Sequence, residues 1–134
     1  MRDLTLTIPG HPAAQGSKKA FVRGKRAVLV EMDPKLPAWR LAVAYVAGDQ
    51  LPDDWAPMDG PLSVEVTFYL PRPKSPKFDE PATPADLDKL QRALGDALTQ
   101  AGVIVDDARI VHWDARKKYA NHTTGCVLTI SAIP

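Results

Sequence analysis

The sequence predicts a small, single α/β domain in which two main helices pack on a mixed β-sheet. Apolar and polar residues alternate over residues 4–8 and 64–70, the pattern of strands with one buried face. Apolar residues recur at helical spacing over 36–46 and 87–101, as they do in amphipathic helices. The predicted order of strand, hairpin, helix, strand, helix, strand, strand favours one sheet with the helices packed on it.

The first elements are a strand and a hairpin. The strand covers residues 4–8 and ends at Pro9-Gly10. Two short apolar runs, 21–22 and 27–30, then flank a basic tetrapeptide in which Gly24 supplies the turn. We therefore expect a β-hairpin with a positively charged tip.

The first helix follows two prolines. Pro34 and Pro37 precede the apolar run 38–47, and prolines are tolerated at a helix entrance because the first N–H groups have no partner there. Gly48 is the expected end of this helix. A strand with one buried face is then predicted over 64–70.

The second half of the chain begins with a proline-rich, charged loop over residues 71–84, which we expect to be mobile or ordered on binding. The helix at 87–101 follows, and Gly102 is its expected C-terminal cap. Two further strands are predicted over 109–119 and 126–133. No repeat or linker divides the chain, so residues 1–134 are expected to form one domain.

The composition limits the class of protein. With 134 residues, 45% of them hydrophobic and 25% charged, the chain has the composition of an ordinary globular domain. No apolar run approaches the roughly 20 residues that span a bilayer, and residues 1–5 have no apolar signal core. The single Cys126 lies in an apolar run, which favours a buried, inert thiol over a nucleophile. We expect a cytoplasmic protein without a membrane segment.

Charge is distributed unevenly although the net charge is only +1. Acids concentrate in the middle of the chain, and three basic clusters flank them. Such an arrangement suits a polyanion held near a metal site, although each cluster taken singly also fits a solvated loop. The candidate DNA-binding clusters are Lys18, Lys19, Arg23, Lys25 and Arg26; Arg72, Lys74 and Lys77; and Arg116, Lys117 and Lys118.

The candidate catalytic residues are aspartates around the second helix. Closely set aspartates repel one another, so a fold that gathers them usually neutralises them with a cation. Asp86 and Asp88 point about 200° apart on a regular helix, so they share a cation only if Asp86 lies outside it as the N-cap. Asp107 joins them only if the chain returns alongside the helix toward its start.

A purely structural interpretation of the same residues stays open. Residues 83–86 also fit a capping box whose proline takes the first helical position. Asp88, Arg92 and Asp96 form a surface stripe at i, i+4 and i+8, and residues 106–107 fit a turn.

At these residues the chain resembles the RusA family of Holliday-junction resolvases, which are found mostly in bacteriophages and prophages. A looser resemblance covers the opening strand, the basic loop after it and the helix with Trp39-Arg40. The specific part of the resemblance consists of Asp86-Leu87-Asp88, the basic residue Arg92, Asp96-Ala97-Leu98-Thr99, Ala101-Gly102 and Asp106-Asp107-Ala108.

The resemblance implies a homodimeric RusA-like endodeoxyribonuclease that cuts four-way DNA junctions by paired symmetric nicks in recombination and repair. It implies Mg²⁺, with Mn²⁺ as a substitute, held by Asp86, Asp88 and Asp107, and no organic cofactor. The family's catalytic lysine falls on Arg92, which keeps the charge but does not readily donate a proton. Lys89, next to Asp88, is the candidate to share or replace that lysine.

Two other functions remain open. The departure at Arg92 allows a non-catalytic module of the same fold that binds branched DNA. The acids also fit a small α/β protein in which they serve only as helix caps and surface pairs. Metal-dependent nicking of a synthetic junction distinguishes the three.

Overall fold

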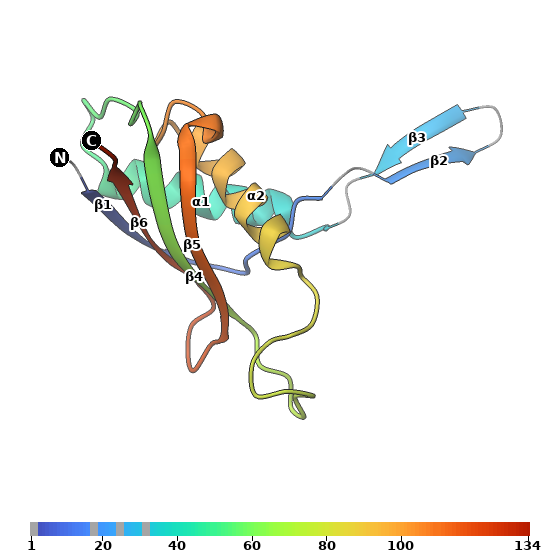
Figure 1. Cartoon of the computed structure of the whole chain (residues 1–134). Helices are drawn as coiled ribbons and strands as arrows, with labels where there is room; N and C mark the ends of the chain where they lie inside the picture. The colour runs from blue at the N-terminus through green and yellow to red at the C-terminus, as the bar shows by residue number, and fades with distance from the viewer. Residues whose placement is uncertain (1–2, 17–18, 24–25, 31–32) are drawn as a thin grey trace.

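The computed structural model describes residues 3–16, 19–23, 26–30 and 33–134 (Figure 1). The order of its elements confirms the predicted alternation of strands and helices. The elements are β1 (Asp3–Pro9), β2 (Lys19–Arg23), β3 (Arg26–Val30), α1 (Leu36–Gln50), β4 (Leu62–Leu70), α2 (Leu87–Gln100), the short 3-10 helix η1 (Asp107–Arg109), β5 (Ile110–Tyr119) and β6 (Gly125–Ala132).

The main sheet has four strands in the order β1-β6-β4-β5. The pair β4 and β5 is parallel, whereas β6 runs antiparallel to both β1 and β4, so the sheet is mixed as predicted. A parallel pair needs a crossover connection, and α2 lies in the connection between β4 and β5. This crossover places residues before α2 near the end of β5 and residues after α2 near its start.

The hairpin does not join the main sheet, contrary to the expectation of a single sheet. Strands β2 and β3 pair antiparallel as a separate two-stranded sheet, with Arg23 opposite Arg26 (Figure 1). The predicted hairpin is therefore confirmed. Gly24 and Lys25 at its tip lie outside the described residues.

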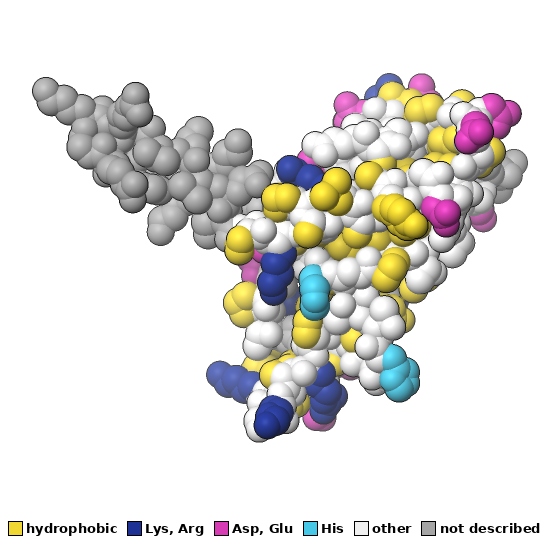
Figure 2. All heavy atoms as spheres, turned by 180° about the vertical axis from the view of Figure 1, so that it is seen from behind, with side chains coloured by type: hydrophobic (Ala, Val, Ile, Leu, Met, Phe, Trp, Pro, Cys, Tyr) yellow, Lys and Arg dark blue, Asp and Glu magenta, His cyan; other side chains and the backbone are white. Residues whose placement is uncertain are grey.

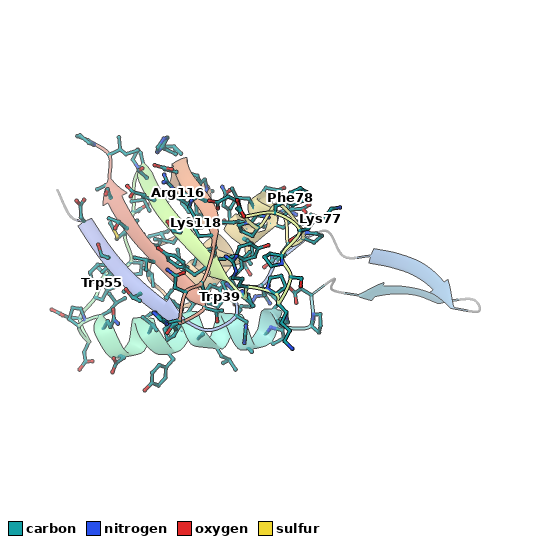
Figure 3. All side chains as sticks on the ribbon, turned by 90° about the horizontal axis from the view of Figure 1, so that it is seen from below. Trp39, Trp55, Lys77, Phe78, Arg116 and Lys118 are labelled. Carbon is teal, nitrogen blue, oxygen red and sulfur yellow. The ribbon has the colours of Figure 1, made fainter. Side chains whose placement is uncertain are left out.

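The core lies between one face of the main sheet and the two helices. Burial alternates along β4, where Leu62, Val64, Val66 and Phe68 are buried and the residues between them are not. One face is therefore covered, and apolar side chains of both helices pack there. Trp39 of α1, with 1% of its surface exposed, lies between that helix and the sheet (Figure 3). Burial of these apolar side chains is the main term that stabilises the fold.

Helix α1 runs past its predicted end. Gly48 is exposed within the helix and no atom lies within 4 Å of the Cβ it lacks, so the glycine costs only its intrinsic propensity of about 1 kcal/mol. The N–H of Leu51 still donates to the carbonyl of Ala47 at 3.0 Å. Leu51 itself is extended because Pro52 follows it, and the residue before a proline avoids helical dihedrals.

Helix α2 matches its prediction within one residue at its C-terminal end. Asp86 is extended and is the N-cap, as a shared cation requires, and Gly102 takes the left-handed φ of +74° just after the end. The capping-box interpretation is wrong, because Pro84 precedes the helix and the Asp86 side chain makes no capping hydrogen bond. The carboxylate of Asp86 is thus not occupied by helix capping.

Among the described residues, no helix has both the length and the apolar character needed to cross a membrane.

Lys and Arg side chains gather at the lower end of the molecule in Figure 2, where the loop between β4 and α2 lies (Figure 1).

Candidate active site

Two of the predicted aspartates and Arg92 line the same groove. Asp88, Arg92 and Gly95 are spaced i, i+4 and i+7, which places them on one face of α2. Asp107 at the start of η1 and Trp113 on the helix-facing side of β5 form the opposite wall. The groove has a volume of about 200 Å³, and Gln91 completes its lining. The return of Asp107 alongside α2, which sequence spacing left open, is therefore observed.

Hydrogen bonds fix the turn that carries Asp107. The carboxylate of Asp106 caps η1 by accepting the N–H of Ala108 at 2.9 Å. Arg109, at the other end of η1, donates from Nε to Asp59 Oδ1 at 2.6 Å and so ties the turn to the loop before β4. These hydrogen bonds hold the turn that presents Asp107 to α2.

Gly95 allows Asp107 to approach the helix. A Cβ built on Gly95 would lie 3.2 Å from the Cβ of Asp107, which is closer than side chains normally tolerate. Sequence reasoning missed this residue. The available signal was a glycine in the interior of a helix, which costs about 1 kcal/mol relative to alanine and usually has a packing reason.

Negative charge accumulates around Asp107. Partial burial raises the pKa of the Asp107 carboxyl, and the hydrogen bond and charge of Asp106 and the charge of Asp96 raise it further. The pKa of Asp106 is lowered instead, first by the N–H of Ala108. A site where carboxylates destabilise one another's charged forms is stabilised by a bound cation.

Asp86 lies apart from this groove. Its carboxylate is 3.5 Å from the Nζ of Lys89, and both residues line a second, larger pocket instead. Among the residues that the structure describes, no three His, Cys, Asp or Glu side chains form a group that could hold a metal ion. The structure therefore brings Asp88 and Asp107 together but does not add Asp86, and the three-aspartate metal site stays a prediction.

The two candidate basic residues face different surroundings. Lys89 pairs with Asp86, and its backbone carbonyl accepts the N–H of Gln15 at 3.0 Å. Arg92 is exposed in the groove and has no hydrogen-bond or ion-pair partner among the described residues. Its guanidinium is free to bind a phosphate, which accepts two parallel hydrogen bonds from arginine.

Lys117 holds the segment that leads to Asp86. Its Nζ donates to the carbonyls of Thr83 and Ala85, each at 2.9 Å. Lys117 lies on the helix-facing side of β5, opposite Phe68 of β4. Lys117, which was expected to bind DNA, thus positions a loop. This contact could not be predicted from the sequence because its partners are backbone carbonyls.

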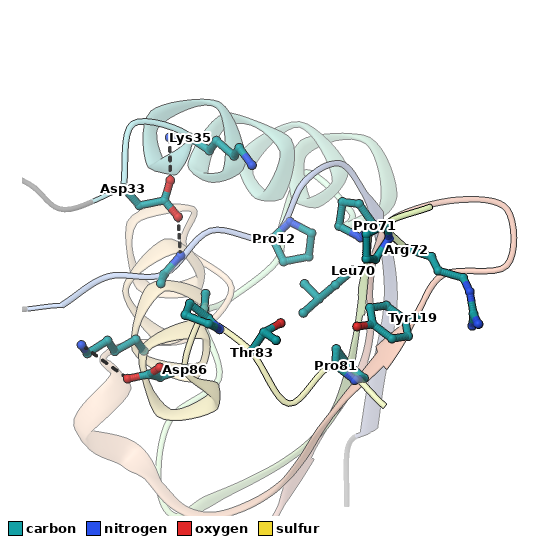
Figure 4. Close-up of a pocket in the computed structure, with 15 residues that line it drawn as sticks. Pro12, Asp33, Lys35, Leu70, Pro71, Arg72, Pro81, Thr83, Asp86 and Tyr119 are labelled. Atoms are coloured by element: carbon teal, nitrogen blue, oxygen red, sulfur yellow. Dashed lines mark hydrogen bonds and ion pairs between the residues drawn. The ribbon is translucent and has the colours of Figure 1, made fainter. Parts of the chain in front are cut away.

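The second pocket has a volume of about 650 Å³ and lies at the carboxyl ends of β4 and β5 (Figure 4). Proline side chains form much of its wall. The guanidinium of Arg72 lies 5.4 Å from the centroid of the Tyr119 ring, within the range of a cation–π contact. Other lining residues include Pro12, Asp33, Lys35, Leu70, Thr83, Asp86 and Lys89.

Comparison with known proteins gives the family. The family described as "Endodeoxyribonuclease RusA" matches residues 9–131 of the chain. The chain belongs to the RusA family of endodeoxyribonucleases. It is also similar to "Uncharacterized protein YqaN" of Bacillus subtilis (strain 168), with 28% identity over 130 residues that cover 87% of this chain and 88% of the relative. The resemblance inferred from the aspartate motif is confirmed.

In this RusA-family chain the cluster at the end of β5 is divided between two faces. Arg116 and Lys118 project from the open face of the sheet, where they pair with Asp114 at 3.2 Å and Glu80 at 3.0 Å. Lys117 projects from the other face. These three residues do not form one basic patch, and a role for any of them in DNA binding stays a prediction.

The other two basic clusters differ in what the structure describes. Arg72, Lys74 and Lys77 are exposed on the loop before α2, where Lys77 Nζ lies 5.6 Å from the Phe78 ring (Figure 3). Of the hairpin cluster, Lys18 and Lys25 lie outside the described residues. The remaining members, Lys19, Arg23 and Arg26, belong to the paired strands β2 and β3.

Proposed function

We propose that this protein is a divalent-metal-dependent endonuclease that resolves Holliday junctions by paired symmetric nicks during DNA recombination and repair. The observation that carries the proposal is the groove in which Asp88, Arg92 and Asp107 meet in a RusA-family chain. Carboxylates can hold a metal ion that activates water, and a guanidinium can stabilise the charge that develops on the phosphate. The substrate is branched DNA in the cytoplasm of a bacterium. The enzyme itself is encoded by a phage or prophage gene.

The donor set of the groove suits Mg²⁺, with Mn²⁺ as a substitute. Asp88 and Asp107 supply hard oxygen ligands. Partial burial, and then the neighbouring carboxylates, raise the pKa of Asp107, so a bound cation would favour its ionised form. Few protein ligands suffice because Mg²⁺ keeps several waters. Asp86 is the proposed third ligand; its carboxylate makes no capping hydrogen bond and, among the described residues, pairs only with Lys89. A bound ion supplies an activated water and neutralises charge on the phosphate.

The basic residues act on the phosphate. Arg92 binds the non-bridging oxygens of the scissile group and stabilises the charge that develops on them. It does not serve as a general acid, because a guanidinium stays protonated. Lys89 can supply the proton or a second positive charge once Asp86 leaves it for the metal. The leaving oxygen otherwise takes its proton from water.

The proposed enzyme works as a homodimer. A four-way junction is cut on two symmetric strands, and a two-fold dimer presents two identical centres for them. Analytical ultracentrifugation of the purified chain tests the stoichiometry. A monomer at micromolar concentration, free and on DNA, contradicts this part of the proposal.

A synthetic four-way junction tests the activity. We expect paired nicks at symmetry-related positions with Mg²⁺ or Mn²⁺ and none with chelator, while linear duplex of the same sequence stays intact. Nicks that persist in chelator contradict the metal role. Equal cutting of linear duplex contradicts the structural specificity.

A second candidate function is junction binding without catalysis. It is favoured by arginine at the position of the family's lysine and by the separation of Asp86 from the groove. This candidate predicts tight, metal-independent binding of the junction and no nicks at any metal concentration.

A further inference from the structure

Apart from Asp86 and Lys89 at its edge, the residues of the larger pocket have no role in the reaction proposed for the groove. It is enclosed by the loop over residues 71–86, the segment 12–14, residues 33–35 before α1 and the ends of β4 and β5. Its wall is largely apolar and contains Leu70 and the rings of five prolines, which are Pro12, Pro71, Pro73, Pro81 and Pro84. Such a wall suits a planar ligand with apolar faces.

One side of the pocket offers a stacking surface. Tyr119 lies half-buried at the end of β5, with the guanidinium of Arg72 over its ring. Aromatic rings and arginine planes are the surfaces on which proteins stack nucleobases. The hydroxyl groups of Thr83 and Tyr119 point toward each other across the pocket in Figure 4, where they can meet the polar edge of a base.

The charges at the rim suit a nucleotide. Lys35 and Arg72 supply positive charge there, and neither makes a side-chain ion pair among the described residues. The nearby carboxylate of Asp33 is already occupied, because it accepts the N–H groups of Ala14 at 3.0 Å and Lys35 at 2.9 Å. The sugar-phosphate backbone of the occupant can thus lie against cations at the rim.

The pocket adjoins the groove. Asp86 and Lys89 line the pocket, while Asp88 and Arg92 line the groove, so the first turns of α2 separate the two sites. A helix with its side chains is about 10 Å across, which corresponds to roughly three stacked nucleotides of one strand. A strand whose phosphate lies in the groove therefore passes the pocket within a few nucleotides.

We propose that this pocket binds a nucleobase unstacked from the centre of the junction, a few nucleotides from the scissile phosphate. The inference rests on the proposed function, because the occupant belongs to the strand held in the groove. Unstacking costs least where pairing is already interrupted, as at a branch point. The pocket would then favour junctions over intact duplex.

A double-mutant cycle on junction binding tests the pocket. Abasic nucleotides are placed one at a time at the four positions on each side of the crossover, and dissociation constants are measured in chelator for the wild type and Tyr119→Leu. We expect one abasic position to weaken wild-type binding roughly tenfold. The same position should have almost no effect in Tyr119→Leu, because base and ring act as a pair.

Two more variants control for misfolding and for losses of affinity that do not depend on the base. Arg72→Gln, on an exposed loop, should show the same coupling at the same position. Tyr45→Leu, on the exposed surface of α1, should leave the abasic effect at its wild-type size. Additive losses for Tyr119→Leu and Arg72→Gln overturn the proposal. The proposal is also overturned if the only effect of Tyr119→Leu is a smaller fraction of dimer in sedimentation. That result would mean that a second copy of the chain, and not a nucleobase, occupies the pocket.

Failure of the pocket and failure of the enzyme are distinguishable. Metal-dependent nicks without coupling at any position reject the base pocket and keep the nuclease. Coupling without nicks keeps the pocket and supports the junction-binding module. A chain that binds no junction at all rejects both.

Discussion

At the scale of single residues, the groove depends on a side chain that is absent. Gly95 lets Asp107 lie against α2, and Trp113 closes the same space from β5. Any larger residue at position 95 would have to push Asp107 outward. Because Asp107 lies on an exposed turn, it can move without disturbing the core.

Gly95→Ala should separate stability from activity. The alanine raises helix propensity, so the free energy of unfolding should stay level or rise by up to about 1 kcal/mol. The displaced Asp107 should raise the Mg²⁺ concentration for half-maximal nicking several-fold. Gly48→Ala in α1 is the matched control, because its new Cβ meets no atom within 4 Å. A Gly95→Ala enzyme with an unchanged Mg²⁺ requirement contradicts the role of this glycine.

Asp88→Asn should abolish nicking and keep or strengthen junction binding. The change removes a proposed metal ligand and also a negative charge that faces DNA. Gel-shift titration in chelator and nicking with Mg²⁺ measure the two effects on one protein preparation. Full nicking activity in this variant would remove Asp88 from the catalytic centre.

The buried Cys126 predicts a pH dependence of stability. Burial raises the pKa of its thiol from 9.0 to about 12, so the folded protein keeps the proton over a range where the unfolded chain loses it. The free energy of unfolding that the protonated thiol contributes is complete below pH 9. It is lost as the pH rises toward 12, by up to about 1.4 kcal/mol per pH unit. Urea unfolding at pH 8 to 10 should show a smaller loss in Cys126→Ala than in the wild type. Parallel pH curves for the two proteins contradict the prediction.

At the scale of elements, β5 links both sites. Its helix-facing residues include Trp113 in the groove, Lys117 under the loop before α2, and Tyr119 in the larger pocket. The parallel pairing of β4 and β5 brings Leu70 opposite Tyr119, so the loop leaving β4 starts beside the end of β5. One strand thereby sets the position of Asp86 relative to the groove.

Lys117→Met should loosen the loop before α2. The substitution keeps the apolar stem but removes both hydrogen bonds to the carbonyls of Thr83 and Ala85. A loss of about 1 kcal/mol in unfolding free energy is expected, since a hydrogen bond to a charged group contributes more than that only when well buried. Trypsin should cut faster after Lys74 and Lys77. Lys117→Arg keeps a charged donor and should restore part of the protection; equal digestion of wild type and Lys117→Met contradicts the contact.

At the scale of the whole molecule, the basic residues proposed to face DNA are divided among separate regions. Arg116 and Lys118 already lie against carboxylates on the open face of the sheet, which reduces the counterions they can release. The hairpin carries a denser run of positive charge in the sequence. The long-range attraction for a junction should therefore come more from the hairpin than from the open face.

Neutralising Lys25 and Arg26 together should weaken junction binding and flatten its salt dependence. If both contact phosphates, the slope of log affinity against log salt falls by about two. Arg116→Gln with Lys118→Gln is the charge-matched control and should change the slope less. An unchanged slope for the hairpin variant moves the DNA surface elsewhere, and a larger change in the control moves it to the open face.

The periodic elements and the family could be predicted from the amino-acid sequence alone. Alternation along β4 and helical spacing along α2 are local properties that burial on one face imposes, so they were predictable to within a few residues. The aspartate spacing from Asp86 to Asp107 pointed to the family that the comparison confirmed. The prediction that α1 ends at Gly48 was wrong, because an exposed glycine only weakly disfavours a helix. Pro52 ends the helix instead, since it keeps the backbone of Leu51 extended.

Which side chains meet depends on how the chain folds and could not be predicted from the sequence. Asp88 and Asp107 share a groove, Asp86 faces a different pocket, and Lys117 binds backbone carbonyls, because the crossover through α2 sets the two ends of β5 against different parts of that helix. Such contacts join residues far apart in the chain and depend on register and strand order. No periodicity within a short window carries that information.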